Sequence, residues 1–320
     1  MENVHHGMKA KTIKSIIRSK VNDWIESITD EQLRKQLKNN VIVTGGCIVS
    51  MLLGEPVNDF DVYLKDHDTC LAVGRYYVDR FKEKHATGIK HDMTLEDSDG
   101  RIRIVVQSAG VASEKGTEKP YEYFEGSPDE RAAGYVADVM SDPGEIEEAY
   151  QETEKKALET ENETEDKYRP VFLSTNAITL SGKIQIVLRF YGAVEEIHAN
   201  YDYVHCTSYW TSNDGSLTLR PEAMESMLAR ELRYTGSKYP VCSLVRMRKF
   251  IQRGWRVNAG QILKMIMQIN ELNLKDIGVL QDQLTGVDSA YFVQLIKRLR
   301  EKDPEKVNAA YLVEIIDRMF

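Results

Sequence analysis

Residues 41–64 read VIVTGGCIVSMLLGEPVNDFDVYL, and this stretch decides the fold that the sequence predicts. Its pattern indicates a β-strand at 41–44, a Gly45-Gly46 turn, a short apolar helix, and a second strand carrying Asp59 and Asp61. Alternate residues of a strand share a face, so the two carboxylates should lie about 6–7 Å apart on one side. Because paired like charges are costly without a cation between them, the pair predicts a Mg²⁺ (or Mn²⁺) site.

The composition bounds the class of protein. The chain has 320 residues and 42% hydrophobic content, enough for one large domain or two ordinary ones. Its apolar runs are too short for a transmembrane helix, and its start lacks the apolar core of a secretory signal. The four cysteines stand apart from one another in the sequence, which favours reduced thiols and a cytoplasmic location over disulfides or a zinc site. We therefore expect no membrane partner.

The negative charge is concentrated in one segment. Residues 140–168 hold eleven acidic residues and three lysines. This segment alone therefore has a charge of −8, which equals the net charge of the whole chain. The remainder is neutral, so basic surfaces elsewhere are compatible with a nucleic-acid partner.

Helical patterns flank the opening stretch. Residues 8–28 and 30–39 predict two helices that cover the sheet, with Thr29 and Asp30 able to cap the second. Residues 69–84 predict an amphipathic helix, and 102–107 a strand paired with the chain near 88–94. From about 110 to 169 the signal weakens, and we interpret this region as an acidic insertion.

Regular structure is predicted again from Pro170 onward. Residues 171–180 and 183–190 predict two strands of a hairpin joined by Ser181-Gly182, and a short helix is expected at 193–199. Helices are predicted at 221–233, 240–253, 258–271, 274–285, 288–301 and 303–319. The fold class is therefore α+β. The predicted organisation is N-terminal helices at 1–40, a mixed-sheet domain with flanking helices at 41–220, and an all-helical domain at 221–320.

The run from Gly45 to Val62 resembles the head-domain signature of CCA-adding tRNA nucleotidyltransferases and bacterial poly(A) polymerases, within the DNA polymerase β-type nucleotidyltransferase superfamily. The shared pattern is two glycines, a short helix ending Leu-Leu-Gly, a turn with proline, and Asp-x-Asp. The match covers about 25 residues, and the C-terminal half is not matched residue by residue.

The resemblance implies a metal-dependent transfer of NMP from an NTP, such as ATP, to an acceptor hydroxyl, with an RNA (tRNA-like) 3′ end as one candidate. Gly45 and Gly46 would let backbone amides approach the triphosphate at a helix N-terminus. Asp59 and Asp61 would hold the metal and act as catalytic carboxylates.

Two departures from the family pattern bear on activity. Family members carry an Arg-Asp pair after the glycines, where this chain has Val49 and Ser50, and Ser50 could still offer a hydroxyl to a phosphate. The third carboxylate is expected on the neighbouring strand, where alternation places Gln185. Asp202 is the candidate replacement. The alternative interpretation of Asp202 is that it is a polar residue that caps the segment 201–203.

Further residues were assigned by position. Arg189 shares a face with Gln185 and could contact the triphosphate or form a salt bridge. His198 and His205 flank Asp202; both are better explained as packed or capping residues, although His205 could shuttle a proton.

Residues 243–256 form a basic stretch that could hold an acceptor through Arg246, Arg248, Lys249 and Arg253, with Phe250 and Trp255 able to stack a base. The alternative is a helix whose apolar face packs inward (Leu244, Met247, Phe250 and Ile251) and whose basic face is solvated.

Two other functions remain open from the sequence. The chain could retain the fold without catalysis and act as a binding or structural module, as Val49, Ser50 and Gln185 suggest. It could also modify a protein hydroxyl, as a toxin-like nucleotidyltransferase does.

Overall fold

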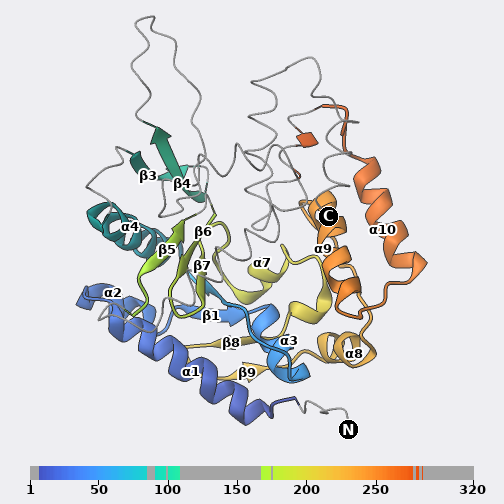
Figure 1. Ribbon diagram of the computed structural model, residues 1–320, viewed down its shortest axis with the longest axis horizontal. Coiled ribbons are helices and arrows are strands. Elements are labelled where there is room, and N and C mark those ends of the chain that lie inside the picture. Colours follow the sequence, from blue (N-terminus) through green and yellow to red (C-terminus); the bar gives the residue numbers. More distant parts are fainter. Residues whose placement is uncertain are drawn as a thin grey trace, which may run out of the picture. The chain divides into compact units, whose positions relative to one another are not determined.

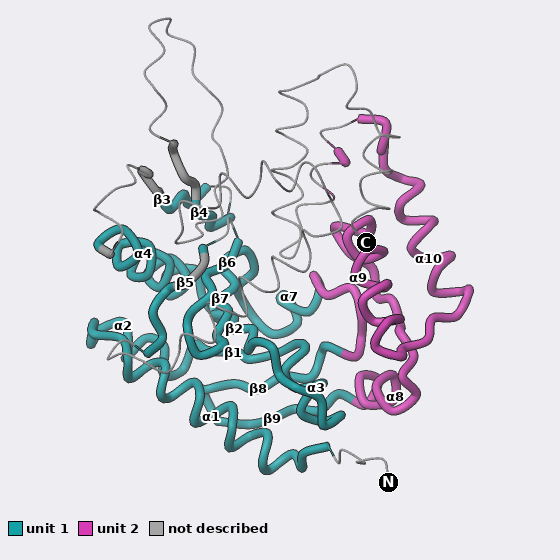
Figure 2. The backbone as a smooth tube through the Cα atoms, in the orientation of Figure 1, with its two compact units in different colours: residues 1–126, 163–199, 206–220 teal, residues 127–162, 200–205, 221–320 magenta. Residues whose placement is uncertain are grey.

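The computed structural model describes residues 7–84, 91–98, 100–108, 167–173, 176–276, 279, 280 and 283. The chain forms two compact units (Figure 2). Unit 1 draws on residues 1–126, 163–199 and 206–220, and unit 2 on residues 127–162, 200–205 and 221–320. Nearly all of the predicted insertion at 110–169, and the helices predicted at 288–301 and 303–319, lie outside the described residues. The domain boundaries at 40 and 220 stay predictions.

Unit 1 is built on a mixed sheet, as predicted (Figure 1). Its seven described strands lie in the order β5 (Pro170–Leu173), β6 (Ala177–Leu180), β7 (Ile184–Val187), β2 (Phe60–Leu64), β1 (Val41–Thr44), β8 (Tyr209–Thr211) and β9 (Leu217–Thr218). β2 and β7 pair in parallel, and the other neighbours pair antiparallel. A separate antiparallel pair joins β3 (His91–Ser98) to β4 (Arg101–Ser108), which confirms the pairing predicted for 102–107.

The helices of unit 1 lie where the periodicity predicts them. They are α1 (Ala10–Ser27), α2 (Glu31–Leu37), α3 (Gly46–Leu53), α4 (His67–Lys84) and α7 (Val194–His198). The predicted cap of α2 is confirmed, because the Asp30 carboxylate accepts from the Leu33 backbone N–H at 3.0 Å.

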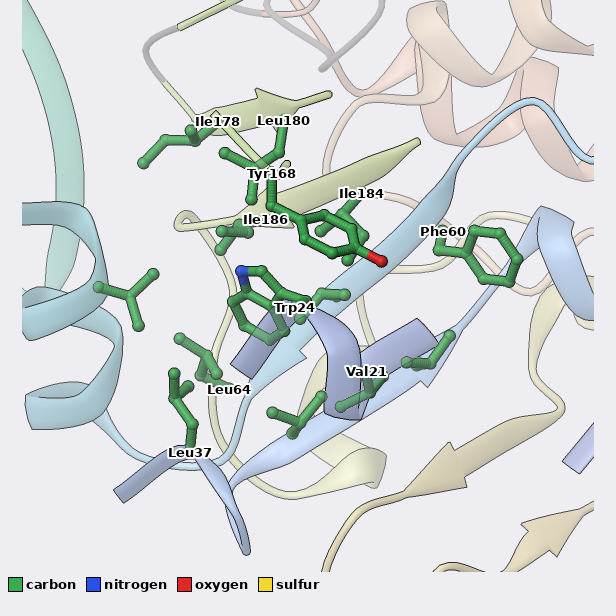
Figure 3. Close-up of a cluster of buried hydrophobic side chains, with 14 of the residues drawn as sticks. Val21, Trp24, Leu37, Phe60, Leu64, Tyr168, Ile178, Leu180, Ile184 and Ile186 are labelled. Atoms are coloured by element: carbon green, nitrogen blue, oxygen red, sulfur yellow. The ribbon is translucent and has the colours of Figure 1, made fainter. Parts of the chain in front are cut away.

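One face of the sheet is buried under apolar side chains (Figure 3). Alternation places Val62 of β2 and Ile184 and Ile186 of β7 on this face, in one cluster with Trp24 of α1. The Trp24 Nε1–H donates to the Tyr77 hydroxyl of α4 at 2.8 Å, which ties the two helices together within the core. Each such buried side chain contributes about 1.5–3 kcal/mol. The same alternation directs Asp61 and Gln185 to the opposite face.

The predicted hairpin needs two corrections. Residues 171–180 form two strands, β5 and β6, that pair antiparallel with each other, so the chain reverses between Leu173 and Ala177. β7 ends at Val187, because the backbone N–H groups of Leu188 and Arg189 both donate to the Asn176 carbonyl. A polar residue such as Asn176 is typical of turns. The apolar residues on both sides of it made the segment resemble one continuous strand.

The strands β8 (Tyr209–Thr211) and β9 (Leu217–Thr218) were not predicted. β8 pairs with β1 through Val43 and Trp210, and Trp210 is buried. These strands span only three and two residues. Alternation over so few residues carries no periodic signal, so the strands are defined by their pairing with β1.

Unit 2 contains the helices α8 (Pro221–Ala229), α9 (Pro240–Gln252) and α10 (Ala259–Asn270). The helix predicted at 221–233 is too long, because Arg230 adopts a left-handed φ of 48° and ends it. Residues 274–276 lie in a turn, so the helix predicted to begin at 274 was placed too early. None of the helices in the described part of the chain has the length and apolar content that crossing a bilayer requires.

Candidate active site

The turn between β1 and α3 opens a helix N-terminus. Gly45 has φ 93° and ψ −147°, a conformation essentially restricted to glycine, and its N–H donates to the Cys206 carbonyl at 3.2 Å. Gly46 begins α3 and is exposed, and a Cβ built on it meets nothing within 4 Å. Gly45, the residue before α3, has no side chain that could cap the helix. The first backbone N–H groups of α3 therefore need a partner from outside the helix, which an anion can provide.

The two carboxylates stand at the start of β2. Asp59 and Asp61 are half-buried, while Phe60 between them is buried in the core. Burial raises the pKa of the Cys47 thiol well above its usual value, and the negative charges of Asp61 and Asp59 raise it further. Cys47 lies in the first turn of α3. Both carboxylates are therefore within electrostatic range of the helix start that Gly45 and Gly46 expose.

Gln185 occupies the position beside Asp61. The two are register partners across the parallel β2–β7 pair, so the neighbour predicted from topology is confirmed. Thr179 of β6 is the partner of Gln185 on the other side. The strand next to the Asp pair thus offers an amide oxygen where a third carboxylate was expected.

Arg189 and Ser50 lie in more enclosed surroundings. Arg189 follows β7, is 9% exposed, and places its guanidinium 5.5 Å from the centre of the Phe190 ring. Ser50 lies in the second turn of α3 and is 7% exposed, beside the buried Val49. Their contacts with a nucleotide stay predictions.

Asp202 belongs to unit 2. Its carboxylate accepts from the Arg246 guanidinium at 2.5 Å, and the Asp202 carbonyl accepts from the Thr235 N–H. The ion pair balances both charges within this unit, and it engages one of the arginines predicted to bind an acceptor. The role of Asp202 as a third catalytic carboxylate stays a prediction.

His198 and His205 are packed residues, which confirms the first interpretation given for them. His198 Nε2 lies 2.9 Å from the Thr44 hydroxyl. His205 is 1% exposed, and its ring centre lies 4.2 Å from that of Trp255 and 4.7 Å from that of Phe250. Burial lowers the pKa of His205 to about 3, helped by the charge of Arg253. A neutral imidazole enclosed in this way is unsuited to shuttling a proton near pH 7.

The basic stretch of α9 differs from its prediction in two respects. Trp255 is 3% exposed, so it cannot stack a base. The expected apolar face is turned inward only in part: the Phe250 ring packs against His205, but Leu244 and Ile251 are 39% and 46% exposed, and the buried residues of α9 lie in its first turn. Arg248 on α9 and Arg253 directly after it are exposed, and Lys249 is half-buried, so positive charge lies at the surface of this stretch.

The donor set near Asp59 and Asp61 suits Mg²⁺. In the part of the chain that the structure describes, no three His, Cys, Asp or Glu side chains gather as a metal site. Mg²⁺ is commonly held by one or two carboxylates, with water and substrate phosphates completing its shell. Two carboxylates and a neutral amide oxygen fit that pattern, provided that the substrate supplies the other ligands.

Two residues of this site were not foreseen. Cys47 was expected only to be a reduced thiol like the other three cysteines, and the influence of Asp61 and Asp59 on it follows from the packing of α3 on β2. Lys183 contacts the loop before Asp59 from the β6–β7 turn. No local sequence signal marks either contact, because each joins segments distant in the chain.

Comparisons with known proteins place the chain in context. The model of a family described as Gabija anti-defense 2 family protein matches residues 15–230. The protein named Gabija anti-defense 2 from Bacillus phage SPbetaL7 is 20% identical over 123 residues, which are 38% of this chain and 31% of that protein. The matched region therefore spans about a third of the length of this curated relative.

Solved structures with some similarity include CCA-adding enzymes. The Thermotoga maritima CCA-adding enzyme complexed with tRNA matches with a TM-score of 0.38 and 12% identity, over 88% of this chain and 56% of that one. A CCA-adding enzyme in complex with ATP gives a TM-score of 0.41 and 12% identity, over 97% and 54%.

Proposed function

The chain belongs to the Gabija anti-defense 2 family, and from this premise we propose that it counters Gabija defence through a nucleotidyltransferase site. The site would be formed by the Gly45-Gly46 turn, Asp59 and Asp61. It would transfer NMP from an NTP to an acceptor hydroxyl, and the anti-defence effect would depend on that transfer.

One observation carries the proposal: α3 packs against β2, the strand at whose start Asp59 and Asp61 lie, and the residue before α3 is a glycine with no side chain to cap the helix. A triphosphate needs backbone amides for its oxygens and a divalent cation for its charge, and this arrangement provides a place for both. The packing of α3 on β2 therefore makes sense as the support of a cation site.

Each group has a distinct part in the transfer. The N–H groups at the start of α3 would bind phosphate oxygens, and Asp59 and Asp61 would hold Mg²⁺, with Gln185 orienting a phosphate or a metal-bound water. Mg²⁺, when bound, would neutralise the charge that develops on the phosphoryl oxygens. The acceptor oxygen bonds to the α-phosphorus as the bond to pyrophosphate breaks, and the hydroxyl proton passes to solvent.

An RNA hydroxyl is the acceptor that we favour. Arg248 and Arg253 supply exposed positive charge on α9, which suits a polyanion, although the chain as a whole is acidic. A protein hydroxyl is the alternative acceptor, and labelling separates the two.

The test incubates the protein with each α-labelled NTP, Mg²⁺, and cellular RNA and protein from Gabija-containing and Gabija-free cells. We expect label in one macromolecular pool, and at least a 100-fold loss of label in the double variant Asp59→Asn/Asp61→Asn. This change preserves shape and removes the charge that the cation requires. Equal labelling by the double variant would rule out the site.

A binding-only function is the second candidate, and the Asp202–Arg246 ion pair favours it because that carboxylate already has a cationic partner. The same double variant separates the two functions in cells. If Asp59→Asn/Asp61→Asn protects phage from Gabija as well as the original protein does, the anti-defence effect needs no transfer.

A further inference from the structure

Lys183 has an unusual backbone conformation. It ends the turn between β6 and β7 with φ 60°, directly after Gly182 with φ 82°. A left-handed conformation costs a residue with a side chain about 1–3 kcal/mol, and glycine or asparagine would occupy it more readily. A lysine at this position is explained if its side chain makes a contact that the smaller residues cannot make.

The side chain and the backbone of Lys183 both reach the segment that carries Asp59. The Lys183 ammonium donates to the Val57 carbonyl at 3.2 Å. The Lys183 carbonyl accepts from the Phe60 N–H at 2.7 Å, at the start of the parallel β2–β7 pair. The two contacts fall on either side of Asp59, two residues before it and one residue after it.

The opposite end of this loop is also anchored. α3 ends at Leu53, the following Gly54 has a left-handed φ of 70°, and the Glu55 N–H donates to the Ser50 carbonyl at 2.8 Å. The loop from α3 to β2 is thus fixed at its start by the helix and at its end by Lys183. The position of the Asp59 carboxylate relative to Asp61 depends on the second anchor, because Asp59 lies just outside the strand.

We propose that Lys183 is a positioning residue, whose ammonium and carbonyl hold residues 57–60 so that Asp59 and Asp61 face a single cation. The inference rests on the proposed function, since it requires these carboxylates to bind a metal. A cation bound by two carboxylates needs both at a fixed separation. Releasing one of them therefore weakens binding even though neither ligand is changed.

The experiment measures binding of Mn²⁺ to the full chain by electron paramagnetic resonance, without nucleotide. The variants are Lys183→Met, which keeps the aliphatic stem, and Lys183→Gly, which also relieves the left-handed backbone. We expect both to bind Mn²⁺ about tenfold more weakly. Lys183→Gly should unfold at the same or a higher temperature than Lys183→Met. Lys167→Met is the matched control, because Lys167 is an exposed lysine paired with Asp23.

Hydrogen exchange of the peptide 55–63 gives a readout independent of metal. We expect faster exchange in both Lys183 variants and unchanged exchange in Lys167→Met. If the original protein binds no Mn²⁺, the proposed function fails. If it binds Mn²⁺ but the Lys183 variants match it, or if their exchange at 55–63 is unchanged, the positioning role is wrong while the proposed function stands.

Discussion

At the scale of single residues, the two glycines of the turn have separate roles despite being adjacent. Gly45 is buried with φ 93°, whereas Gly46 is exposed at the first position of α3 with open space around its missing Cβ. Only the first glycine is needed for folding. The second keeps the helix start accessible, so a substitution there should weaken ligand binding without destabilising the fold.

We therefore predict opposite effects of alanine at these positions. Gly45→Ala should lower the free energy of unfolding by about 1–3 kcal/mol, because an L-residue is strained in that conformation. Gly46→Ala should leave it unchanged or raise it by up to about 1 kcal/mol, since alanine favours a helix, yet it should weaken NTP binding. Urea unfolding and nucleotide titration check the pair. Equal destabilisation by both variants would contradict the distinction.

The register of the site residues was predictable from the sequence, but their surroundings were not. Strand alternation and topology placed Gln185 beside Asp61 correctly. The burial of Trp255 against His205, and the contact of Lys183 with Val57, depend on packing between distant segments. A single aromatic or basic residue in a helical or turn pattern does not reveal which of these environments it will meet.

At the scale of elements, one histidine adds a polar contact to the apolar packing of the β3–β4 pair against α4. His67, at the start of α4, lies 2.9 Å from the Asp97 carboxylate of β3 and 3.0 Å from that of Asp68. Its ring also packs edge-on against Tyr191, whose hydroxyl donates to the Gly100 carbonyl. The hydrogen bond to Asp97, and then that to Asp68, raise the pKa of His67 above its usual value.

This arrangement predicts a pH dependence of the attachment. A raised pKa in the folded state means that the stabilisation is complete below the unfolded pKa of about 6.5 and is lost as pH rises through the folded value. The amide hydrogens of β3 should therefore become less protected against exchange, after correction for intrinsic rates, as pH rises above about 6.5. Asp97→Asn should reduce this change, and an unaltered profile in that variant would show that Asp97 is not the cause.

Long periodic elements were predicted well, and short ones were not. α1 and α4 carry apolar residues at helical spacing over 18 residues each, and both helices formed as expected. β8 and β9 contribute five residues between them, yet they extend the sheet beyond β1. Strands of this length are stabilised by their partners, so their own sequence contains too little information to identify them.

At the scale of the whole molecule, each unit encloses a neutral histidine. In unit 1, burial lowers the pKa of His198 to about 4, with a further contribution from the positive charge of Arg220. In unit 2, burial lowers the pKa of His205 to about 3, and Arg253 adds to the effect. Both histidines take up a proton more readily in the unfolded chain. Acid should therefore lower the free energy of unfolding of both units.

We predict that the free energy of unfolding falls as pH decreases from about 6.5 toward 4, because the unfolded chain binds more protons than the folded chain in this window. His205→Phe should flatten the part of this dependence that belongs to unit 2. It should also maintain or raise stability at pH 7, because both ring nitrogens of His205 are buried without a hydrogen-bond partner among the described residues. Urea unfolding between pH 4 and pH 8, with hydrogen exchange of peptides from each unit, measures both effects.

His67→Gln is the control, since the contribution of His67 to the pH dependence of stability has the opposite sign. An identical acid dependence of unit 2 in His205→Phe and the original protein would show that His205 titrates normally and is not enclosed by Trp255 and Phe250.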